Sequence, residues 1–280
     1  NPTSSIIPLM NTFRDNQDYE ADMFVNNHEA KEIMDDNTLL VVVDTNKPSI
    51  TQCEDLLYMA KMIVVLDHHR QGSDTIRNSV LSYIEPYASS ASEMVAEILQ
   101  YFTEGIRIRN VEADSIYAGI MIDTDNFMQK TGVRTFEAAA FLRRCGADVT
   151  RVRKLFREDM NDYKARGETI RNAELFRGQF AISECPSDYV DSPTVVGAQA
   201  ANELLNIVGV KASFVLTEYK GVIYISARAI DEVNVQIIME RMGGGGHLNM
   251  AGCQLETVNM EGARSLLKST LTEMQDGGEI

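Results

Sequence analysis

The chain has 280 residues, of which 44% are hydrophobic and 24% charged, so it can bury a core and is not disordered by composition. Its net charge of −15 argues against a protein that binds long nucleic acid, although divalent cations could reverse the local field around a phosphate-bearing substrate. Four scattered cysteines without C-x-x-C spacing predict free thiols in a reducing, cytoplasmic environment. No apolar run approaches the ~20 residues that span a bilayer, so we expect no membrane contact by this segment.

The first half of the chain has the pattern of an α/β domain. Residues 38–43 and 62–66 are short, continuous, β-branched runs, which are typical of fully buried parallel strands. The segment between them opens with Pro48 and Ser49, and its Leu and Met spacing suits a helix. We therefore expect a β-α-β unit with a parallel sheet. Further helices are expected over residues 90–102, 113–122 and 135–145, the last of them closed by Gly146.

The pattern changes in the second half of the chain. Residues 149–176 are charged and predict a long helical stretch that connects two domains. The remaining segments predict strands over residues 179–185, 211–220 and 221–230, with a hairpin turn at Lys220 and Gly221, and helices over residues 195–207, 233–242 and 261–274. The expected organisation is a parallel-sheet domain over residues 1–148, a helical connector over 149–178 and a smaller mixed α/β domain over 179–280.

Both strands of the β-α-β unit end in an aspartate, Asp44 in VVVDTN and Asp67 in VVLDHH. The carboxyl ends of adjacent parallel strands meet at one edge of the sheet, where ligands bind in open α/β folds. His68 and His69 add nitrogen donors, and the combined set suits Mn²⁺, Mg²⁺ or Co²⁺. The alternative is that Asp44 caps the next helix and the histidines are merely solvated.

A third acidic feature is the segment YAGIMIDTDNF, in which Asp123 and Asp125 follow an apolar helical run. A helix that ends at the same edge of the sheet would bring a carboxylate ligand from a third element. Taken alone, a helix C-cap followed by a turn is the simpler interpretation of these two aspartates.

A glycine-rich segment, RMGGGGHLNMAGC, lies in the second domain. Four consecutive glycines are costly in a regular element, but they suit a backbone that approaches an anion closely. Upstream, Ser226 and Arg228 occupy alternate positions of a strand and so project from one face. Together with His247 they predict a phosphate pocket, and a flexible linker is the alternative.

The segments VVVDTN, VVLDHHR, YAGIMIDTDNF and GGGGH, in this order, resemble the DHH phosphoesterase superfamily with its DHH-associated second domain. The longer segments EPYASSASEMVAEIL and ARAIDEVNVQIIMERMGGGGH look closest to the catalytic region of GdpP-type cyclic-di-AMP phosphodiesterases. The resemblance covers nearly the whole chain from about Thr38. It implies a two-metal phosphodiesterase that hydrolyses cyclic di-AMP to linear 5′-pApA.

Carried over residue by residue, the resemblance implies a site for two metal ions, most readily Mn²⁺. Asp44 is then expected to bridge both ions, His68 to bind one, and Asp123 to bind the other or contact both. Asp67 is expected to support His68 by orienting its imidazole.

The resemblance also implies contacts to the substrate. His69 and Arg70 are expected to face the scissile phosphate. In the second domain, the nucleotide and its distal phosphate are expected to lie against Ser226, Arg228, Gly243, Gly244, Gly245, Gly246 and His247.

One motif of the family has no counterpart in this sequence. The family opens with His-x-x-x-Asp-x-Asp, which supplies further metal ligands, whereas the only histidine before His68 here is His28, in FVNNHEAKEIM. We therefore expect an N-terminally incomplete metal shell, weak metal binding and poor turnover by this chain alone.

Three functions stay open on the sequence. The first is hydrolysis of a cyclic dinucleotide, and the second is a nanoRNase or oligonucleotide phosphodiesterase of the same superfamily that prefers linear dinucleotides. The third is a nucleotide-binding fragment that is inactive for lack of the first metal motif. The resemblance also suggests a homodimer and a parent protein that is membrane-anchored with this region on the cytoplasmic side.

Overall fold

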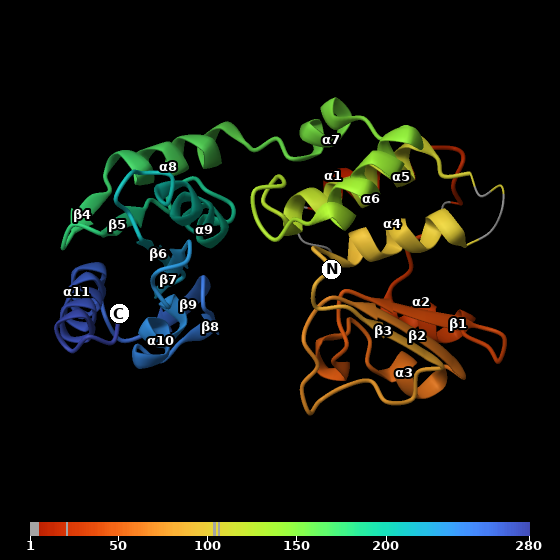
Figure 1. Cartoon of the computed structure of the whole chain (residues 1–280), viewed down its shortest axis with the longest axis horizontal. Helices are drawn as coiled ribbons and strands as arrows, with labels where there is room; N and C mark the ends of the chain where they lie inside the picture. The colour runs from red at the N-terminus through yellow and green to blue at the C-terminus, as the bar shows by residue number, and fades with distance from the viewer. Residues whose placement is uncertain (1–5, 21, 103–104, 106) are drawn as a thin grey trace. The chain divides into compact units, whose positions relative to one another are not determined.

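The structure is a computed structural model that describes residues 6–20, 22–102, 105 and 107–280. It divides into two compact units, Asn1–Arg157 and Glu158–Ile280, each with its own buried clusters (Figure 1). Among the helices it describes, none is both long and apolar enough to cross a bilayer.

The first unit contains the expected parallel sheet, with strand order β1-β2-β3. Its strands are β1 (Leu39–Val43), β2 (Met62–Asp67) and β3 (Leu81–Ile84), and all pairs are parallel. The crossover from β1 to β2 contains a short 3₁₀ turn (Pro48–Ile50) and α3 (Asp55–Met59), so the β-α-β prediction is confirmed.

The expectation that both strands are fully buried is right for β2 and wrong for β1. Ile63 and Val65 of β2 are almost inaccessible, whereas Leu39, Val41 and Val43 of β1 are about half exposed. The reason is that β1 lies at the edge of the described sheet, and alternate side chains of an edge strand can face solvent when one side of the sheet is uncovered there.

Helices outside this sheet complete the first unit, and some of them build its larger buried cluster (Figure 1). They comprise α1 (Ile7–Arg14), α2 (Asn27–Ile33), α4 (Ala91–Tyr101), α5 (Asn110–Asp123), α6 (Val133–Arg144) and α7 (Val149–Leu155). The predicted helices are confirmed at α4, α5 and α6. Ser90 caps α4 by accepting a hydrogen bond from the Glu93 backbone, and Gly146, at φ +103°, ends α6. Residues from α5, α6 and α7, including Ile120, Leu142 and Val152, form one buried cluster.

The stretch predicted as one long helix is two helices and a strand: α7, α8 (Met160–Arg171) and β4 (Glu174–Phe176). Each helix begins at its own aspartate. Asp148 accepts from the Arg151 backbone N–H, and Asp159 accepts from the Asn161 backbone N–H. The first helix contacts α5, whereas the second packs against α9 (Pro193–Leu204), so the two helices belong to different units.

The second unit is built on a mixed sheet with strand order β4-β5-β6-β7-β9-β8. Its other strands are β5 (Phe180–Cys185), β6 (Ala212–Tyr219), β7 (Val222–Ala229), β8 (Gly245–His247) and β9 (Met250–Leu255). The β5–β6 pair is parallel and the remaining pairs are antiparallel. Lys220 and Gly221 both have positive φ and form the predicted hairpin turn.

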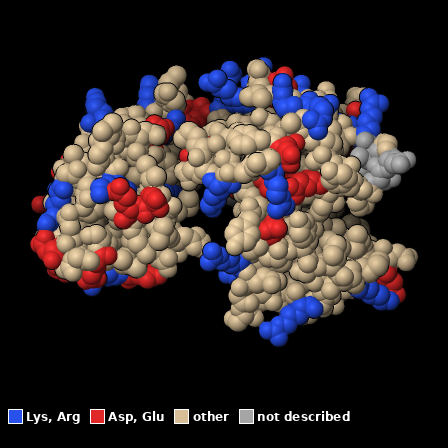
Figure 2. All heavy atoms as spheres, viewed as in Figure 1, with Lys and Arg blue, Asp and Glu red and all other residues tan. Residues whose placement is uncertain are grey.

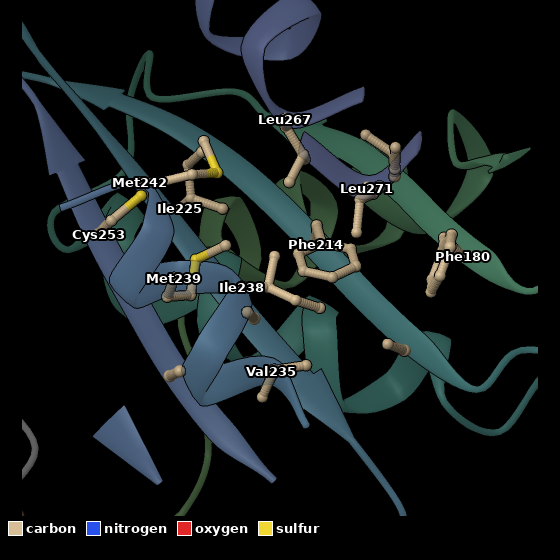
Figure 3. Close-up of a cluster of buried hydrophobic side chains, with 14 of the residues drawn as sticks. Phe180, Phe214, Ile225, Val235, Ile238, Met239, Met242, Cys253, Leu267 and Leu271 are labelled. Atoms are coloured by element: carbon tan, nitrogen blue, oxygen red, sulfur yellow. The ribbon is translucent and has the colours of Figure 1, made fainter. Parts of the chain in front are cut away.

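Helices cover both faces of this sheet. One face packs on α9, and the other carries α10 (Val235–Arg241) and α11 (Met260–Asp276). The second face forms the larger core, which Figure 3 shows with the following side chains labelled: Phe180, Phe214, Ile225, Val235, Ile238, Met239, Met242, Cys253, Leu267 and Leu271. The alternation along β7 places Ile223 and Ile225 in this core and the intervening side chains on the opposite face.

Candidate active site

Three candidate metal ligands from three different elements lie together in the first unit. Asp44 follows β1, His68 follows β2, and Asp123 is the last residue of α5. His68 Nε2 lies 3.3 Å from Asp44 Oδ1 and 4.0 Å from Asp123 Oδ2. The sheet edge and the helix end thus bring together the three residues that the sequence suggested separately.

The electrostatics of this group favour a cation. The hydrogen bond that the His68 ring donates to Asp44 raises the pKa of His68, which means that the two carboxylates stabilise positive charge on the ring. Burial raises the pKa of Asp123, and the negative charge of Asp44 raises it further. A divalent cation held at this site would offset the negative charge of Asp44 that disfavours ionisation of Asp123.

The backbone at Asp44 leaves the sheet abruptly. Its N–H still donates to the Leu66 carbonyl at 3.0 Å, but its φ is +63°, a left-handed conformation that aspartate tolerates better than most residues. One donor atom each from Asp44, His68 and His69 can be chosen so that all three lie within 4.8 Å of one another. Oxygen and imidazole donors at this spacing fit a hard or borderline divalent cation.

The expectation that Asp67 supports His68 is wrong, because Asp67 contacts His69. The Asp67 side chain is fully buried, and its Oδ1 lies 2.7 Å from His69 Nδ1 and 3.2 Å from the His69 backbone N. His68 Nδ1 instead faces the Ala88 carbonyl at 3.4 Å. In both cases the contact at Nδ1 leaves Nε2 as the nitrogen available for a ligand.

Asn46 is a functional candidate that the sequence analysis did not single out. It is buried, and its side-chain amide donates to Asp67 Oδ2 at 2.6 Å and to the His69 carbonyl at 3.2 Å. Its Oδ1 is buried without a hydrogen-bond partner among the described residues. The available signal was its position two residues after Asp44 in VVVDTN, on the same edge of the sheet.

The two remaining candidates of the first unit lie outside the group of donors. Arg70 is exposed and makes no hydrogen bond or ion pair with any residue that the structure describes. Asp125 lies in the left-handed turn after α5, where its side chain accepts from Gln129, so of the two aspartates in this segment only Asp123 faces His68.

The candidate phosphate residues of the second unit share one face of its sheet. Across the strands β7, β9 and β8, Ser226 lies opposite Gly252, which lies opposite Gly245. In the same way, Arg228 lies opposite Met250, which lies opposite His247. Directly opposed residues of antiparallel strands present their side chains on the same side. The two glycines therefore leave a strip without side chains between Ser226 on β7 and the edge strand β8.

The four-glycine segment is not an open loop, because it joins the end of α10 to the short strand β8. Gly243 ends α10 with φ +85°, and Gly245 and Gly246 begin β8. A Cβ on Gly244 would lie 2.1 Å from the Gly252 carbonyl, and one on Gly246 would lie 2.4 Å from the Met250 carbonyl. These two glycines are needed for close approach to β9, whereas a Cβ on Gly245 would meet open space.

Arg228 is a largely buried cation without an acidic partner among the described residues. Its Nη1 donates to the Ala227 carbonyl at 2.9 Å, and its Nε is buried without a partner. Burial lowers the pKa of this guanidinium. Because an uncompensated buried charge is costly, Arg228 is suited to bind an anion.

Two family models match the chain in the order of its units. The DHH family N-terminal domain matches residues 3–120, and the DHHA1 domain matches residues 180–273. The chain belongs to the DHH family. The DHH residues that name the family are therefore Asp67, His68 and His69.

Relatives of this DHH protein include cyclic-di-AMP phosphodiesterases. The chain is 43% identical to the cyclic-di-AMP phosphodiesterase GdpP of Bacillus subtilis (strain 168) over 259 residues, which cover 91% of this chain and 39% of the relative. It is 41% identical to the cyclic-di-AMP phosphodiesterase PdeA of Listeria monocytogenes serotype 1/2a (strain 10403S), with 86% and 37% covered. The chain thus spans about two fifths of the length of these relatives.

A solved structure shares the fold of this DHH protein. The exopolyphosphatase-related protein of Bacteroides fragilis matches with a TM-score of 0.74 at 23% identity, over 85% of this chain and 72% of the other. This match supports the two-unit α/β architecture and says nothing about substrate.

Proposed function

We propose that the chain is the catalytic region of a metal-dependent phosphodiesterase that hydrolyses cyclic di-AMP to linear 5′-pApA. The observation that carries this proposal is the convergence of Asp44, His68 and Asp123, in a chain 43% identical to a cyclic-di-AMP phosphodiesterase. Two Mn²⁺ ions are the proposed cofactor.

The metal would be held by the Asp44, His68 and Asp123 side chains. Bound divalent ions supply Lewis acidity to a phosphoryl oxygen and a hydroxide nucleophile at neutral pH. Two ions require more donors than these three residues offer, because Mg²⁺-like cations take about six oxygen or nitrogen ligands each. We therefore propose that the described residues bind metal weakly and that turnover by them alone is poor.

The remaining residues of the first site would act on the phosphate. Asp67 and Asn46 hold the His69 ring and backbone in place, and we propose that His69 and Arg70 neutralise charge on the non-bridging oxygens. The exposed position of Arg70, with no partner among the described residues, leaves its guanidinium available for this contact.

In the second unit, Arg228 would bind the distal phosphate of the nucleotide. Its buried Nε without a partner supports this role, and the open space at Gly245, where a Cβ would meet nothing within 4 Å, leaves room for the phosphate. Ser226 and His247, on the same face, would donate further hydrogen bonds. Gly243, Gly244 and Gly246 would shape this strip through the backbone alone.

A side-by-side assay of cyclic di-AMP, cyclic di-GMP and pApA with Mn²⁺, on the full-length parent, tests the proposal. Asp44→Asn and His68→Ala should each reduce hydrolysis of cyclic di-AMP at least about a hundredfold, while Asp125→Asn, an acid in the neighbouring turn, should leave it unchanged. Faster cleavage of pApA would favour the oligonucleotide phosphodiesterase, and nucleotide binding without turnover would favour a binding module. Retained hydrolysis after substitution of Asp44 would refute the assignment of the site.

A further inference from the structure

A second cleft lies in the first unit at the end of α5 opposite to Asp123. Its volume is about 1280 Å³, and it is bounded by α1, the beginning of α5, the end of α6 and α7. It is distinct from the candidate metal site. The 14 residues of α5 separate the two, which at 1.5 Å per residue is about 20 Å.

The cleft is basic in a strongly acidic protein. Its lining contains five basic and two acidic side chains, whereas the chain as a whole carries −15: Arg107, Arg109, Arg144, Arg151 and Lys154 against Asp18 and Asp114. Figure 2 shows basic side chains gathered over α7 and the adjoining helix ends. A concave basic surface concentrates anions, and more so against an acidic background.

The acidic side chains neutralise only part of this charge. Asp114 is nearly buried and already accepts from Arg151 Nε at 2.5 Å and from the Asp148 backbone at 2.7 Å. Arg144 and Lys154 make no hydrogen bond or ion pair with any residue in the described part of the chain, and both are exposed. Their charges remain available to a ligand.

The beginning of α5 adds backbone donors to the same cleft. Glu112, in the first turn, accepts from the Arg109 backbone N–H at 2.8 Å, whereas no described side chain accepts from the N–H groups of Asn110 and Val111, which line the cleft. Arg109, immediately before the helix, donates to the Asp18 carbonyl and stacks over the Tyr19 ring. The helix dipole and Arg109 both add positive potential at this end of α5, the Glu112 carboxylate offsets part of it, and an anion in the cleft would be favoured by the remainder.

Helix dipoles alone do not account for the arrangement. Arg144 and Lys154 lie in the last turns of α6 and α7, where basic residues are favourable in any helix. That preference does not explain why both helix ends line the same cleft as the positive end of α5. We propose that this cleft binds a polyphosphate group, either free or carried by a nucleotide, at a site separate from the metal centre.

Calorimetry with tripolyphosphate tests the proposal on this chain, in buffer with EDTA so that bound metal cannot contribute. We expect binding that weakens as salt increases, and a loss of about tenfold or more in affinity for the Arg144→Ala/Lys154→Ala double variant. Lys61→Ala, which removes an exposed cation elsewhere in the unit, should bind normally. The substituted side chains are exposed, so thermal unfolding should show an intact fold.

Comparison of ATP with tripolyphosphate distinguishes a free polyphosphate from a polyphosphate group that is carried by a nucleotide. Equal affinity for ATP and tripolyphosphate indicates that the phosphate chain alone is recognised, and tighter binding of ATP indicates a nucleotide. Absence of binding, affinity unchanged in the double variant, or binding lost in Asp44→Asn would each overturn the proposal, the last because it would place the anion at the metal site. None of these results depends on hydrolysis of cyclic di-AMP.

Discussion

Asp67 is the residue on which the geometry of the DHH motif depends most. Its fully buried carboxylate accepts from the Asn46 amide and contacts the His69 ring, so one side chain connects two loops at the edge of the sheet. Removing it takes away the closer of the two acceptors of the buried Asn46 amide and the carboxylate partner of the His69 ring. We expect Asp67→Ala to lower the free energy of unfolding by about 1–3 kcal/mol, measured by urea denaturation.

The matched control is Asp74→Ala. Asp74 is exposed and accepts only from the Ser49 hydroxyl, so its loss should cost less than about 0.5 kcal/mol. Equal stability of Asp67→Ala and the unsubstituted protein would show that Asp67 is not the acceptor inferred from the structure.

Cys253 should be inert to thiol reagents in the folded protein. It is only 5% exposed, and burial raises its pKa to about 11, so almost no thiolate exists at pH 8. Cys53 is partly exposed and should react with DTNB much faster, which Cys53→Ser identifies by removing the fast phase. Fast native-state labelling of Cys253, located by mass spectrometry, would contradict its burial.

The sequence predicted the site residues better than their partners. Asp44, His68 and Asp123 could be found because the ends of the two strands and of the helix can be located in the sequence. The pairing of Asp67 with His69, and not with the adjacent His68, depends on side-chain torsions and on the Ala88 carbonyl from a distant loop. Asn46 was missed for the same reason, because its role arises only from contact with Asp67.

At the scale of elements, the glycines of β8 serve two different purposes. Gly246 has φ +150° and no room for a Cβ against the Met250 carbonyl, so Gly246→Ala should destabilise the protein by about 1–3 kcal/mol. Gly245→Ala meets open space and should leave stability within about 0.5 kcal/mol. It should instead weaken nucleotide binding, because the methyl group enters the strip beside Ser226.

Thermal unfolding and calorimetry with pApA separate the two effects. A Gly245→Ala variant that is strongly destabilised would show that β8 packs differently from the structure. If its affinity for pApA is unchanged, the strip does not hold the phosphate.

The contact between β4 and α11 should make stability depend on pH. The Lys268 ammonium, followed by the Arg264 guanidinium, holds the pKa of Glu174 below its ordinary value of 4.5. A carboxyl group with a lowered folded-state pKa stabilises the protein above its unfolded-state pKa, and this stabilisation is lost as pH falls through the folded value. Urea midpoints between pH 3 and 7 should therefore fall more steeply below about pH 4.5 in the unsubstituted protein than in Glu174→Gln.

The control for this experiment is Glu218→Gln, an exposed glutamate of β6 that forms no ion pair with any described residue. Its pH profile should follow that of the unsubstituted protein. Identical profiles for Glu174→Gln and Glu218→Gln would show that the β4–α11 contact contributes nothing to acid stability.

Element boundaries were predictable where local signals were strong. Capping by Ser90, the turn at Lys220 and Gly221, and the apolar periodicity of α9 and α11 are all visible in the sequence. The break between α7 and α8 was missed although Asp148 and Asp159 are ordinary N-caps, because charged helical periodicity continues across it. The exposure of β1 could not be predicted, since an apolar strand does not show which neighbour covers it.

At the scale of the whole molecule, the sequence indicated two domains from the change in pattern after the connector. The structure divides the chain between Arg157 and Glu158, inside that connector. Every proposed metal donor belongs to the first unit, and Arg228 with the glycine strand belongs to the second. The proposed metal donors and the proposed site for the distal phosphate therefore lie in separately packed units of the chain.

This division predicts where metal binding stabilises the protein. At an Mn²⁺ concentration about 100 times its dissociation constant, binding adds about 2.7 kcal/mol to the free energy of unfolding of the unit that holds the ion. The most protected amides of that unit should then exchange about a hundredfold more slowly. Hydrogen exchange with mass spectrometry should show this in peptides from β1, β2 and α5. Peptides from residues 158–280 should be unchanged, because no proposed donor lies there.

Two variants make the prediction specific. Asp44→Asn should abolish the added protection, since it removes the carboxylate 3.3 Å from His68 Nε2, whereas Asp125→Asn should retain it. Protection that appears first around β7 and β8, or that survives in Asp44→Asn, would place the dominant metal site outside the DHH unit. Protection confined to β1, β2 and α5 would instead tie metal binding to the meeting point of these three elements, where Asp44, His68 and Asp123 lie.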